Sequence, residues 1–382
     1  MIPYGRQDIR PEDIEAVIET LKSDYLTQGP KVPEFEAAVA KAADAAHCVA
    51  ANSATSALHI ACRALDLGPD DLMWTSPITF VASANVGHLC GADVDFVDID
   101  PGTFNMSATG LADKLTQAKK DGRLPKIIMP VHMCGQSAEM DAIGSLAREF
   151  GVSVIEDASH AIGGRYGNRP IGDCEHSDIT VFSFHPVKIV TTAEGGAATT
   201  QDPRLAQRME LFRSHGVTRN EKFFEGDSHG SWYYQQVELG LNYRITDLQA
   251  ALGTAQMARL DEYVARRNAL ADRYDRLLRD FPLETPERLD RAYSAFHLYV
   301  IRVEATRRRQ IFDHLRANGV GANVHYIPVH TQPYWKRFGF GEGQFPAAED
   351  YYARAISIPL YPTMTETLQD EVVAVLDEAL HL

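Results

Sequence analysis

The stretch CVAANSATSALHIACRALDLG, residues 48–68, joins a short apolar run to a longer amphipathic run that opens with small hydroxyl residues. An apolar run of four to eight residues predicts a buried strand, and the longer run after it predicts a helix. The same pairing recurs along the chain to about residue 200. Repeated strand–helix units of this kind predict a largely parallel sheet with helices on both faces. The fold class is therefore α/β.

The pattern changes after residue 200. Helical patterns over 203–216 and 245–281 follow one another without intervening strands. The remaining runs, with HLYVIRVE, TRRRQIFDHLRANG and a closing helix near 365–380, are typical of a small α+β domain. We therefore predict a large α/β domain over residues 1–253 and a small C-terminal α+β domain over residues 254–382.

The segment KFFEGDSHGSWYYQQVELG, residues 222–240, combines glycine, serine and aromatic residues without a clean period. Such a composition predicts an excursion or flap rather than a regular element. It lies between the two helical patterns that follow residue 200. We expect it to project from the large domain.

Composition excludes several classes of function. The formal net charge of -15 disfavours a nucleic-acid surface, which needs clustered lysine and arginine. No run of 18 apolar residues and no basic leader followed by an apolar stretch is present, so we expect no membrane span. The five cysteines are scattered and form no CxxC pair, which indicates neither a disulfide framework nor a zinc knuckle. A reducing cytoplasm is the expected location.

Lys188 lies in FSFHPVKIVTTAEGGAA, residues 182–198, directly after a predicted strand. Most lysines are exposed and inert. An amine held among Val187, Ile189 and Val190, however, would be desolvated, and its pKa would fall. The uncharged form is a nucleophile toward carbonyl groups. The setting of Lys188 therefore indicates a lysine that forms a Schiff base.

Three other predicted strands end on residues suited to a ligand, and ligands of open α/β sheets gather at the carboxyl ends of the strands. The hydroxyl run with Thr55 and Ser56 opens a helix, which suits a phosphate, although a simple N-cap explains it equally. Asp157 ends a buried strand and needs a cation or several donors, or else caps the next segment. Phe80 follows a third strand, where an aromatic more often belongs to the core.

Together these residues supply what pyridoxal 5'-phosphate (PLP) requires. The aldehyde needs a lysine, the ring nitrogen needs a carboxylate, the ring face needs an aromatic side chain, and the phosphate needs a helix N-terminus with hydroxyl groups. Lys188, Asp157, Phe80 and the run at Thr55 meet these needs. We therefore predict PLP as the cofactor.

Seven motifs then resemble, in order and over nearly the whole chain, the DegT/DnrJ/EryC1/StrS family of sugar aminotransferases, which are fold-type I PLP enzymes. They are NSATSAL, SPITFVASAN, VIEDASHAIGGRYGNRPIG, FSFHPVKIVTTAEGGA, FRSHG, LNYRITDLQAALG and VHYIPVH. The resemblance implies a large domain with a mixed, mostly parallel sheet and a small C-terminal α+β domain.

The resemblance also implies roles for individual residues. Lys188 would be the cofactor-binding lysine and proton shuttle, with Asp157 as the partner of the pyridine nitrogen. The other cofactor contacts would come from Thr55, Ser56, Phe80, His160 and Ser183, and from Asn242, which would reach the cofactor of a neighbouring subunit. The expected assembly is thus a homodimer with shared active sites.

The subgroup of closest resemblance consists of the pseudaminic acid biosynthesis aminotransferases, on the motifs LTQG, NSATSAL, TTAEGGA and FFEG. Their substrates are L-glutamate and a UDP-linked 4-keto-6-deoxy-N-acetylhexosamine. Other UDP- or dTDP-linked keto sugars stay open as alternatives. Expected contacts to the nucleotide sugar are Thr27, Arg244, His325 and Tyr326, although a strand end that packs the small domain explains the last two equally well.

Three rival functions are disfavoured. A nicotinamide-dependent enzyme would carry GxGxxG after an early strand, and none is present. The pairs His132 with Cys134 and Cys174 with His176 lack a third ligand nearby, so they are weak evidence for a metal hydrolase. A non-catalytic PLP-fold regulator would be indicated by a missing lysine or an attached basic module, and the chain shows neither.

Overall fold

The computed structural model describes residues 1–382. Its central feature is a seven-stranded sheet in the order β1-β9-β8-β5-β4-β2-β3. Strand β9 runs antiparallel to both of its neighbours, and the other neighbouring strands are parallel. The prediction of a mixed, mostly parallel α/β sheet is confirmed.

The strands of the main sheet follow the apolar runs of the sequence, and short strands lie outside it. In chain order the strands are β1 (His47–Ala51), β2 (Leu72–Thr75), β3 (Asp93–Phe96), β4 (Ile127–Met129), β5 (Ser153–Asp157), β6 (Arg165–Tyr166), β7 (Arg169–Pro170), β8 (Ile179–Ser183), β9 (Gly196–Thr200), β10 (Val217–Thr218), β11 (Gln235–Gln236), β12 (Ala292–Tyr293), β13 (Tyr299–Arg302) and β14 (Ala355–Ile358).

The helices occupy the amphipathic runs between the strands and most of the C-terminal half. They are α1 (Pro11–Leu21), α2 (Lys31–Ala43), α3 (Ala54–Ala64), α4 (Ala82–Leu89), α5 (Ala108–Lys120), α6 (Met140–Phe150), α7 (Pro203–Arg213), α8 (Asp247–Met257), α9 (Leu260–Leu277), α10 (Arg308–Ala317), α11 (Pro333–Lys336), α12 (Pro346–Arg354) and α13 (Glu366–His381).

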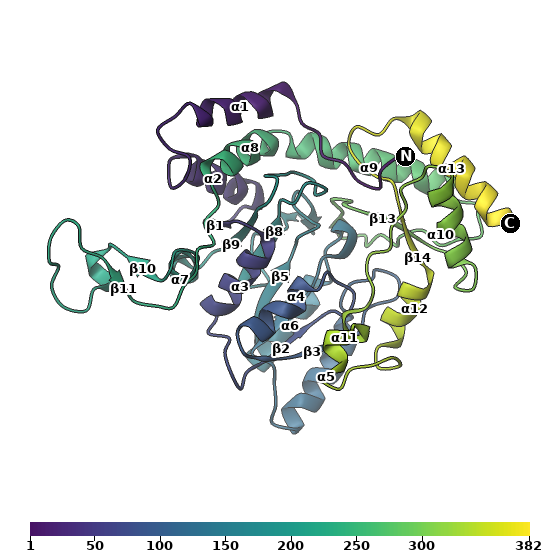
Figure 1. Cartoon of the computed structure of the whole chain (residues 1–382). Helices are drawn as coiled ribbons and strands as arrows, with labels where there is room; N and C mark the ends of the chain where they lie inside the picture. The colour runs from purple at the N-terminus through teal and green to yellow at the C-terminus, as the bar shows by residue number, and fades with distance from the viewer.

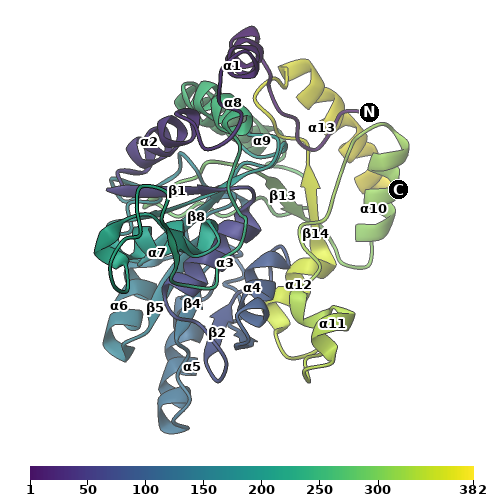
Figure 2. The ribbon, with the colours of Figure 1, turned by 60° about the vertical axis from the view of Figure 1, so that its left-hand side comes forward.

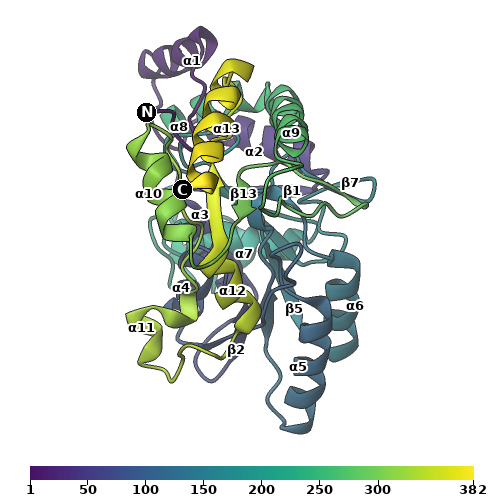
Figure 3. The same cartoon turned by 90° about the vertical axis from the view of Figure 1, so that its right-hand side faces the viewer.

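Helices cover both faces of the sheet, because alternate residues of each strand point to opposite sides. In β1, Val49 and Ala51 belong to a core cluster with α3, α4 and α7, whereas Ala50 belongs to a cluster with α2 and α8. Helices α5 and α6 pack on the same side as α2, over β2, β4 and β5. Figure 3 shows α3 and α4 on one side of the strands and α5 and α6 on the other.

The small domain has its own core. Strands β13 and β14 pair antiparallel, and α10, α13 and the second half of α9 pack around them (Figure 2). The first half of α9 packs instead on the large domain. The predicted boundary between residues 253 and 254 falls inside α8, which packs in the core of the large domain. The chain passes from the large-domain core to the small-domain core within α9, because the two halves of that helix pack in different cores.

The predicted helix over 245–281 is divided in two. Thr246 and Gln249 form a capping box that starts α8, and the helix ends at Met257. At the break, the guanidinium of Arg259 donates to the carboxylate of Asp13, which is fully buried on α1. A buried carboxylate needs such a partner, and this ion pair ties α1 to Arg259, the residue before α9.

The segment predicted as an excursion projects from the body as an arm built on β10 and β11 (Figure 1). It carries exposed apolar side chains, including Trp232 and Leu239. No helix of the structure is long and apolar enough to cross a membrane.

Candidate active site

A cavity of about 480 Å³ opens at the carboxyl ends of the parallel strands. Asp157 is the last residue of β5, and Ser183 is the last residue of β8. Phe80 lies on the loop that follows β2, and Thr55 is in the first turn of α3, directly after β1. Four segments far apart in the sequence thus meet at one edge of the sheet, as the strand pattern predicted.

The cavity brings together most of the site residues predicted from the sequence. Those that line it are Thr55, Phe80, Asp157, His160, Ser183, Lys188, His325 and Tyr326. Four predicted residues do not line it, namely Thr27, Ser56, Asn242 and Arg244.

Lys188 lies on the loop after β8, and its side chain opens into the cavity. The residues that follow it, Ile189 and Val190, are buried, as the sequence led us to expect. Burial lowers the pKa of Lys188 to about 8, against the opposing charge of Asp157. About a tenth of this amine is therefore uncharged at pH 7, far more than for an ordinary lysine, and the uncharged form is the nucleophile toward a carbonyl.

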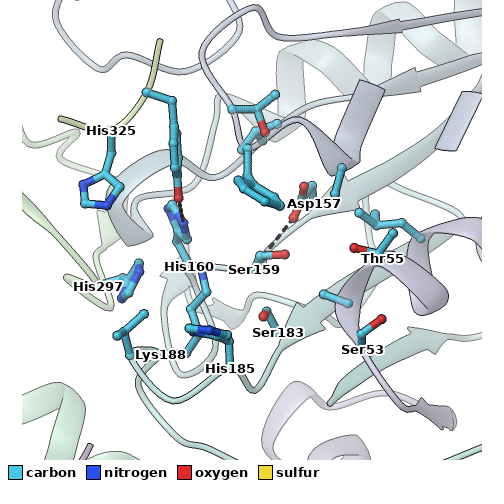
Figure 4. Close-up of a pocket in the computed structure, with 18 of the residues that line it drawn as sticks. Ser53, Thr55, Asp157, Ser159, His160, Ser183, His185, Lys188, His297 and His325 are labelled. Carbon is cyan, nitrogen blue, oxygen red and sulfur yellow. Dashed lines mark hydrogen bonds between the residues drawn. The ribbon is translucent and has the colours of Figure 1, made fainter. Parts of the chain in front are cut away.

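Asp157 is only 4% exposed, and two donors hold its carboxylate. The hydroxyl of Ser83 donates to Oδ2 at 2.6 Å, and the backbone N–H of Ser159 donates to Oδ1 at 3.1 Å (Figure 4). The hydroxyl of Thr79 lies 2.7 Å from that of Ser83 and orients it in turn. The carboxylate is thus fixed at the end of a buried strand with room on its cavity side.

The N-terminus of α3 forms a second wall. Ser53 caps the helix by accepting the N–H of Ser56, and the hydroxyl of Ser56 donates to Asn52 at 2.6 Å. The hydroxyl of Ser56 is therefore already hydrogen-bonded to Asn52 and does not face the cavity, whereas Ser53 and Thr55 line it. The first N–H groups of a helix lack partners within it, so this wall suits an anion.

Strand β9 approaches this wall closely. A Cβ atom at Gly196 would lie 2.5 Å from the backbone N and Cα of Ala54 and from the carbonyl oxygen of Ser53. Only glycine permits this approach, which sets the start of β9 directly behind the first turn of α3.

The opposite wall carries aromatic and imidazole rings. The ring of Phe80 is 59% exposed and lies 6.2 Å from that of Tyr326. His160 Nε2 lies 3.1 Å from the hydroxyl of Tyr326, and its buried Nδ1 has no partner. Burial, followed by the charges of Lys188 and His325, lowers the pKa of His160 well below its ordinary range. His160 is thus neutral, with one ring nitrogen available.

His325 was predicted to contact the nucleotide sugar, and it does line the cavity. Both of its ring nitrogens already have partners, since Nε2 meets the amide of Asn323 at 3.2 Å and Nδ1 meets the hydroxyl of Ser357 at 2.8 Å. Burial and Lys188 lower the pKa of His325 to about 4. Its ring therefore presents an uncharged surface to the cavity rather than a free hydrogen-bonding nitrogen.

Thr27, Asn242 and Arg244 lie together outside the cavity. Thr27 forms an antiparallel bridge with Thr246, and Asn242 forms one with Ser214 at the base of the arm. Thr27 and Asn242 are exposed. Within one chain, these three residues do not line the cavity.

Several residues that line the cavity or hold its side chains were not predicted from the sequence. They are Tyr4, Thr79, Ser83, Ser159, His185, Val187, Glu194 and His297. Ser159 could have been found from its place two residues after Asp157. Tyr4 and His297 could not, because they reach the cavity from the N-terminus and from the junction with the small domain.

The side chains present fit PLP. An amine with a lowered pKa, a fixed carboxylate, an exposed aromatic face and a hydroxyl-lined helix N-terminus line one cavity. The unpaired nitrogen of His160 adds a group that a ring hydroxyl can satisfy. No group of three or more His, Cys, Asp or Glu side chains is arranged to hold a metal ion.

Comparison with known proteins agrees with this chemistry. Residues 7–377 match the profile of the DegT/DnrJ/EryC1/StrS aminotransferase family. The chain is 40% identical over 379 residues to the spore coat polysaccharide biosynthesis protein SpsC of Bacillus subtilis, covering 97% of this chain and 95% of that protein. It is 35% identical over 368 residues to the UDP-4-amino-4,6-dideoxy-N-acetyl-beta-L-altrosamine transaminase of Campylobacter jejuni, covering 95% and 93%.

Solved structures share the whole fold. Helicobacter pylori PseC, an aminotransferase involved in the biosynthesis of pseudaminic acid, superposes with a TM-score of 0.90 at 31% identity and covers 100% of this chain and 99% of its own. The PLP form of the sugar aminotransferase Spr1654 from Streptococcus pneumoniae, whose function is described as putative, gives 0.90 at 29% identity, covering 100% and 98%.

Proposed function

Because the chain belongs to the DegT/DnrJ/EryC1/StrS aminotransferase family, and is therefore a PLP-dependent sugar aminotransferase, we propose that it moves the amino group of L-glutamate to the C4 keto group of a nucleotide-linked 4-keto-6-deoxy sugar. The observation that carries the proposal is the placement of Lys188 and Asp157 in one cavity, at the ends of neighbouring strands β8 and β5.

The chain's own residues divide the work. PLP, when bound, supplies an electron sink for the carbanion that forms when the amino donor loses its proton. Lys188 would hold the aldehyde carbon of the cofactor and, once released, carry that proton between carbon atoms. Asp157 would keep the pyridine nitrogen protonated through a charge-assisted hydrogen bond. Ser53, Thr55 and Ser183 would hold the phosphate at the N-terminus of α3.

The aromatic wall would orient the cofactor and exclude water. Phe80 has an exposed face on the cavity side, and Tyr326 closes the cavity beside it. His160 would meet the ring hydroxyl of PLP through its unpaired nitrogen. Phe80 and His160 are predicted cofactor contacts, whereas Tyr326 was predicted to contact the nucleotide sugar; all three line the cavity.

For the sugar, we propose UDP-4-keto-6-deoxy-N-acetylhexosamine, in pseudaminic acid biosynthesis. The support is the activity of the Campylobacter transaminase and the role of Helicobacter PseC in pseudaminic acid biosynthesis, since both proteins are similar to this chain over nearly their full lengths. A second candidate is a sugar of another surface polysaccharide, because the relative from the Bacillus spore coat pathway has a higher identity, 40% against 35%.

We also propose that the enzyme acts as a cytoplasmic homodimer with shared active sites. The support is the strip of Thr27, Asn242 and Arg244, which lies apart from the chain's own cavity. The guanidinium of Arg244 would contact the diphosphate of the nucleotide sugar bidentately. Asn242 would then reach the phosphate of the neighbouring subunit's cofactor.

The test is an amination screen. The purified protein is incubated with PLP, ¹⁵N-labelled L-glutamate and a panel of UDP- and dTDP-linked 4-keto sugars, and the products are analysed by mass spectrometry. The proposal expects ¹⁵N in the product from the UDP-N-acetylhexosamine, and no transfer by Lys188→Ala. Labelling of a different keto sugar would correct the substrate, and the absence of labelling with every keto sugar would overturn the function.

A further inference from the structure

Arg267 on α9 is a buried cation without a counter-charge. Its side chain is 0% exposed, and burial alone, with no carboxylate to oppose it, lowers the pKa of its guanidinium. One terminal nitrogen donates to the carbonyl oxygens of Phe296, His297 and Leu360 at 3.1, 3.3 and 3.0 Å, and the other two nitrogens have no partner. A buried charge without a partner is costly, so its retention calls for an explanation.

The segment that Arg267 holds leads directly into the cavity. The carbonyls of residues 296 and 297 and that of residue 360 come from separate parts of the chain, and Arg267 ties them together at the junction of the two domains. The side chain of His297 is buried and lines the cavity with Lys188. Figure 4 shows His297 on the same side of the cavity as Lys188 and His160.

The ring of His297 packs behind that of His160, with centroids 4.4 Å apart at an interplanar angle of 51°. The Nδ1 atom of His297 is buried and has no partner. His160 in turn contacts the hydroxyl of Tyr326. Arg267, His297 and His160 therefore form a continuous chain of contacts from the domain junction to the reacting end of the cavity.

Every charged or titratable group that faces His297 opposes its protonation. These groups are Lys188 on the loop after β8, His160 after β5, Arg267 on α9 and His325 on the segment before α11. Burial, and then these groups, lower the pKa of His297 well below its ordinary range. No carboxylate counteracts them, so the imidazole has no partner that would stabilise its charged form.

We propose that Arg267 and His297 are a pair of positioning residues for the transamination reaction. Arg267 fixes the main chain at residue 297, and its charge adds to the effects of burial and of Lys188 that keep the His297 imidazole uncharged behind His160. The buried imidazoles at this end of the cavity, those of His160, His297 and His325, then do not compete with Lys188 for protons. A protonated His297 would repel the Lys188 ammonium and would compete with Lys188 for protons. The inference rests on the proposed role of Lys188 as the reacting amine.

The first test measures the protonation of His297 directly. Exchange of the imidazole C2 hydrogen with deuterated solvent, followed by mass spectrometry of the peptides of the full chain, gives a titration midpoint for each histidine. His381 is an exposed internal control. We expect the midpoint of His297 to lie more than about 1 in pH below that of His381. If His297 titrates together with His381, the proposal is overturned, whatever the variants show.

The second test separates charge from structure. In Arg267→Met, the midpoint of His297 should rise by about 1 in pH, whereas Arg267→Lys should leave it low. The acid limb of the kcat profile should move to higher pH in Arg267→Met and return in the double variant with His297→Phe, which keeps a ring against His160. A purely structural Arg267 would show no midpoint change and no such rescue. If Arg267→Met does not fold, the His297 midpoints of the wild type and of Arg267→Lys still show whether this imidazole is uncharged at neutral pH.

Failure of the positioning pair and failure of the proposed function give different results. If borohydride does not fix PLP to Lys188, the proposed role of this amine is refuted. The titration midpoint of His297 is measured without turnover and does not depend on that result. A low midpoint together with absent fixation would refute the function alone. Normal fixation together with an ordinary midpoint would refute the positioning pair alone.

Discussion

Replacement of Ser83 by alanine should slow the chemical step while leaving substrate binding almost unchanged. The Ser83 hydroxyl donates to Asp157 Oδ2 at 2.6 Å in a buried setting, and only the N–H of Ser159 would remain as a donor. In the proposed mechanism Asp157 would act on the pyridine nitrogen of PLP, where charge develops during proton removal. A less firmly held carboxylate should therefore affect kcat more than KM.

The size of the effect follows from the geometry. A hydrogen bond to a charged group contributes about 1.5–3 kcal/mol. Since about 1.4 kcal/mol corresponds to a tenfold change in rate, the loss in kcat should be about 10- to 100-fold. The hydroxyl of Thr79, which pairs with Ser83 at 2.7 Å, loses its partner as well, so some loss of thermal stability should accompany the change.

The assay is steady-state amination with saturating glutamate, combined with the absorption spectrum of the bound cofactor. Ser83→Thr keeps a hydroxyl and should retain most of the activity. Ser145→Ala is the matched control, because that hydroxyl is exposed and bonds only to its own helix and a neighbouring arginine. An unchanged kcat in Ser83→Ala, or a change confined to KM, would refute the assignment of Ser83 as the support of Asp157.

Three further predictions concern packing and charge. Gly196→Ala should cost about 2 kcal/mol of stability and weaken PLP binding, because its Cβ would lie 2.5 Å from the start of α3; Gly341→Ala, with nothing within 4 Å, is the control in thermal melts and PLP titrations. Burial by itself raises the pKa of Glu156, but hydrogen bonds from His132 and two hydroxyls outweigh it, so the pKa is lowered. Glu156→Gln should therefore lose about 2 kcal/mol in urea unfolding at pH 7, and that difference should vanish as the pH falls below about 4. The rate of PLP capture by the cofactor-free chain should rise with a midpoint near pH 8, since burial lowers the pKa of Lys188 to about 8; a rise that continues to about pH 10 would contradict the dry setting of this amine.

The sheet and the residues at its strand ends could be predicted from the sequence because their signals are local. Apolar runs of strand length alternate with helical periods up to residue 200, and each run became a strand of the main sheet. Asp157 and Lys188 were found for the same reason, since Asp157 ends an apolar run and Lys188 lies on the loop after another. Their meeting in one cavity then follows from the parallel arrangement of the strands.

The supporting residues could not be predicted in this way, because they depend on contacts between distant segments. Ser83 reaches Asp157 from α4, and Arg267 reaches His297 from α9. Nothing in the helical pattern around either residue distinguishes it from a neighbour on the same face. The break before α9 and the two-residue strands β6, β7 and β12 escaped prediction for the same reason, as each is set by tertiary partners.

The most direct test of the account is chemical fixation of the cofactor. Purified protein is mixed with PLP, reduced with borohydride and digested, and the peptides are sequenced by mass spectrometry. The account predicts one pyridoxyl adduct per chain, on Lys188, and its loss when glutamate is added before reduction. An adduct on any other lysine, or a protein whose spectrum PLP does not change, would contradict it.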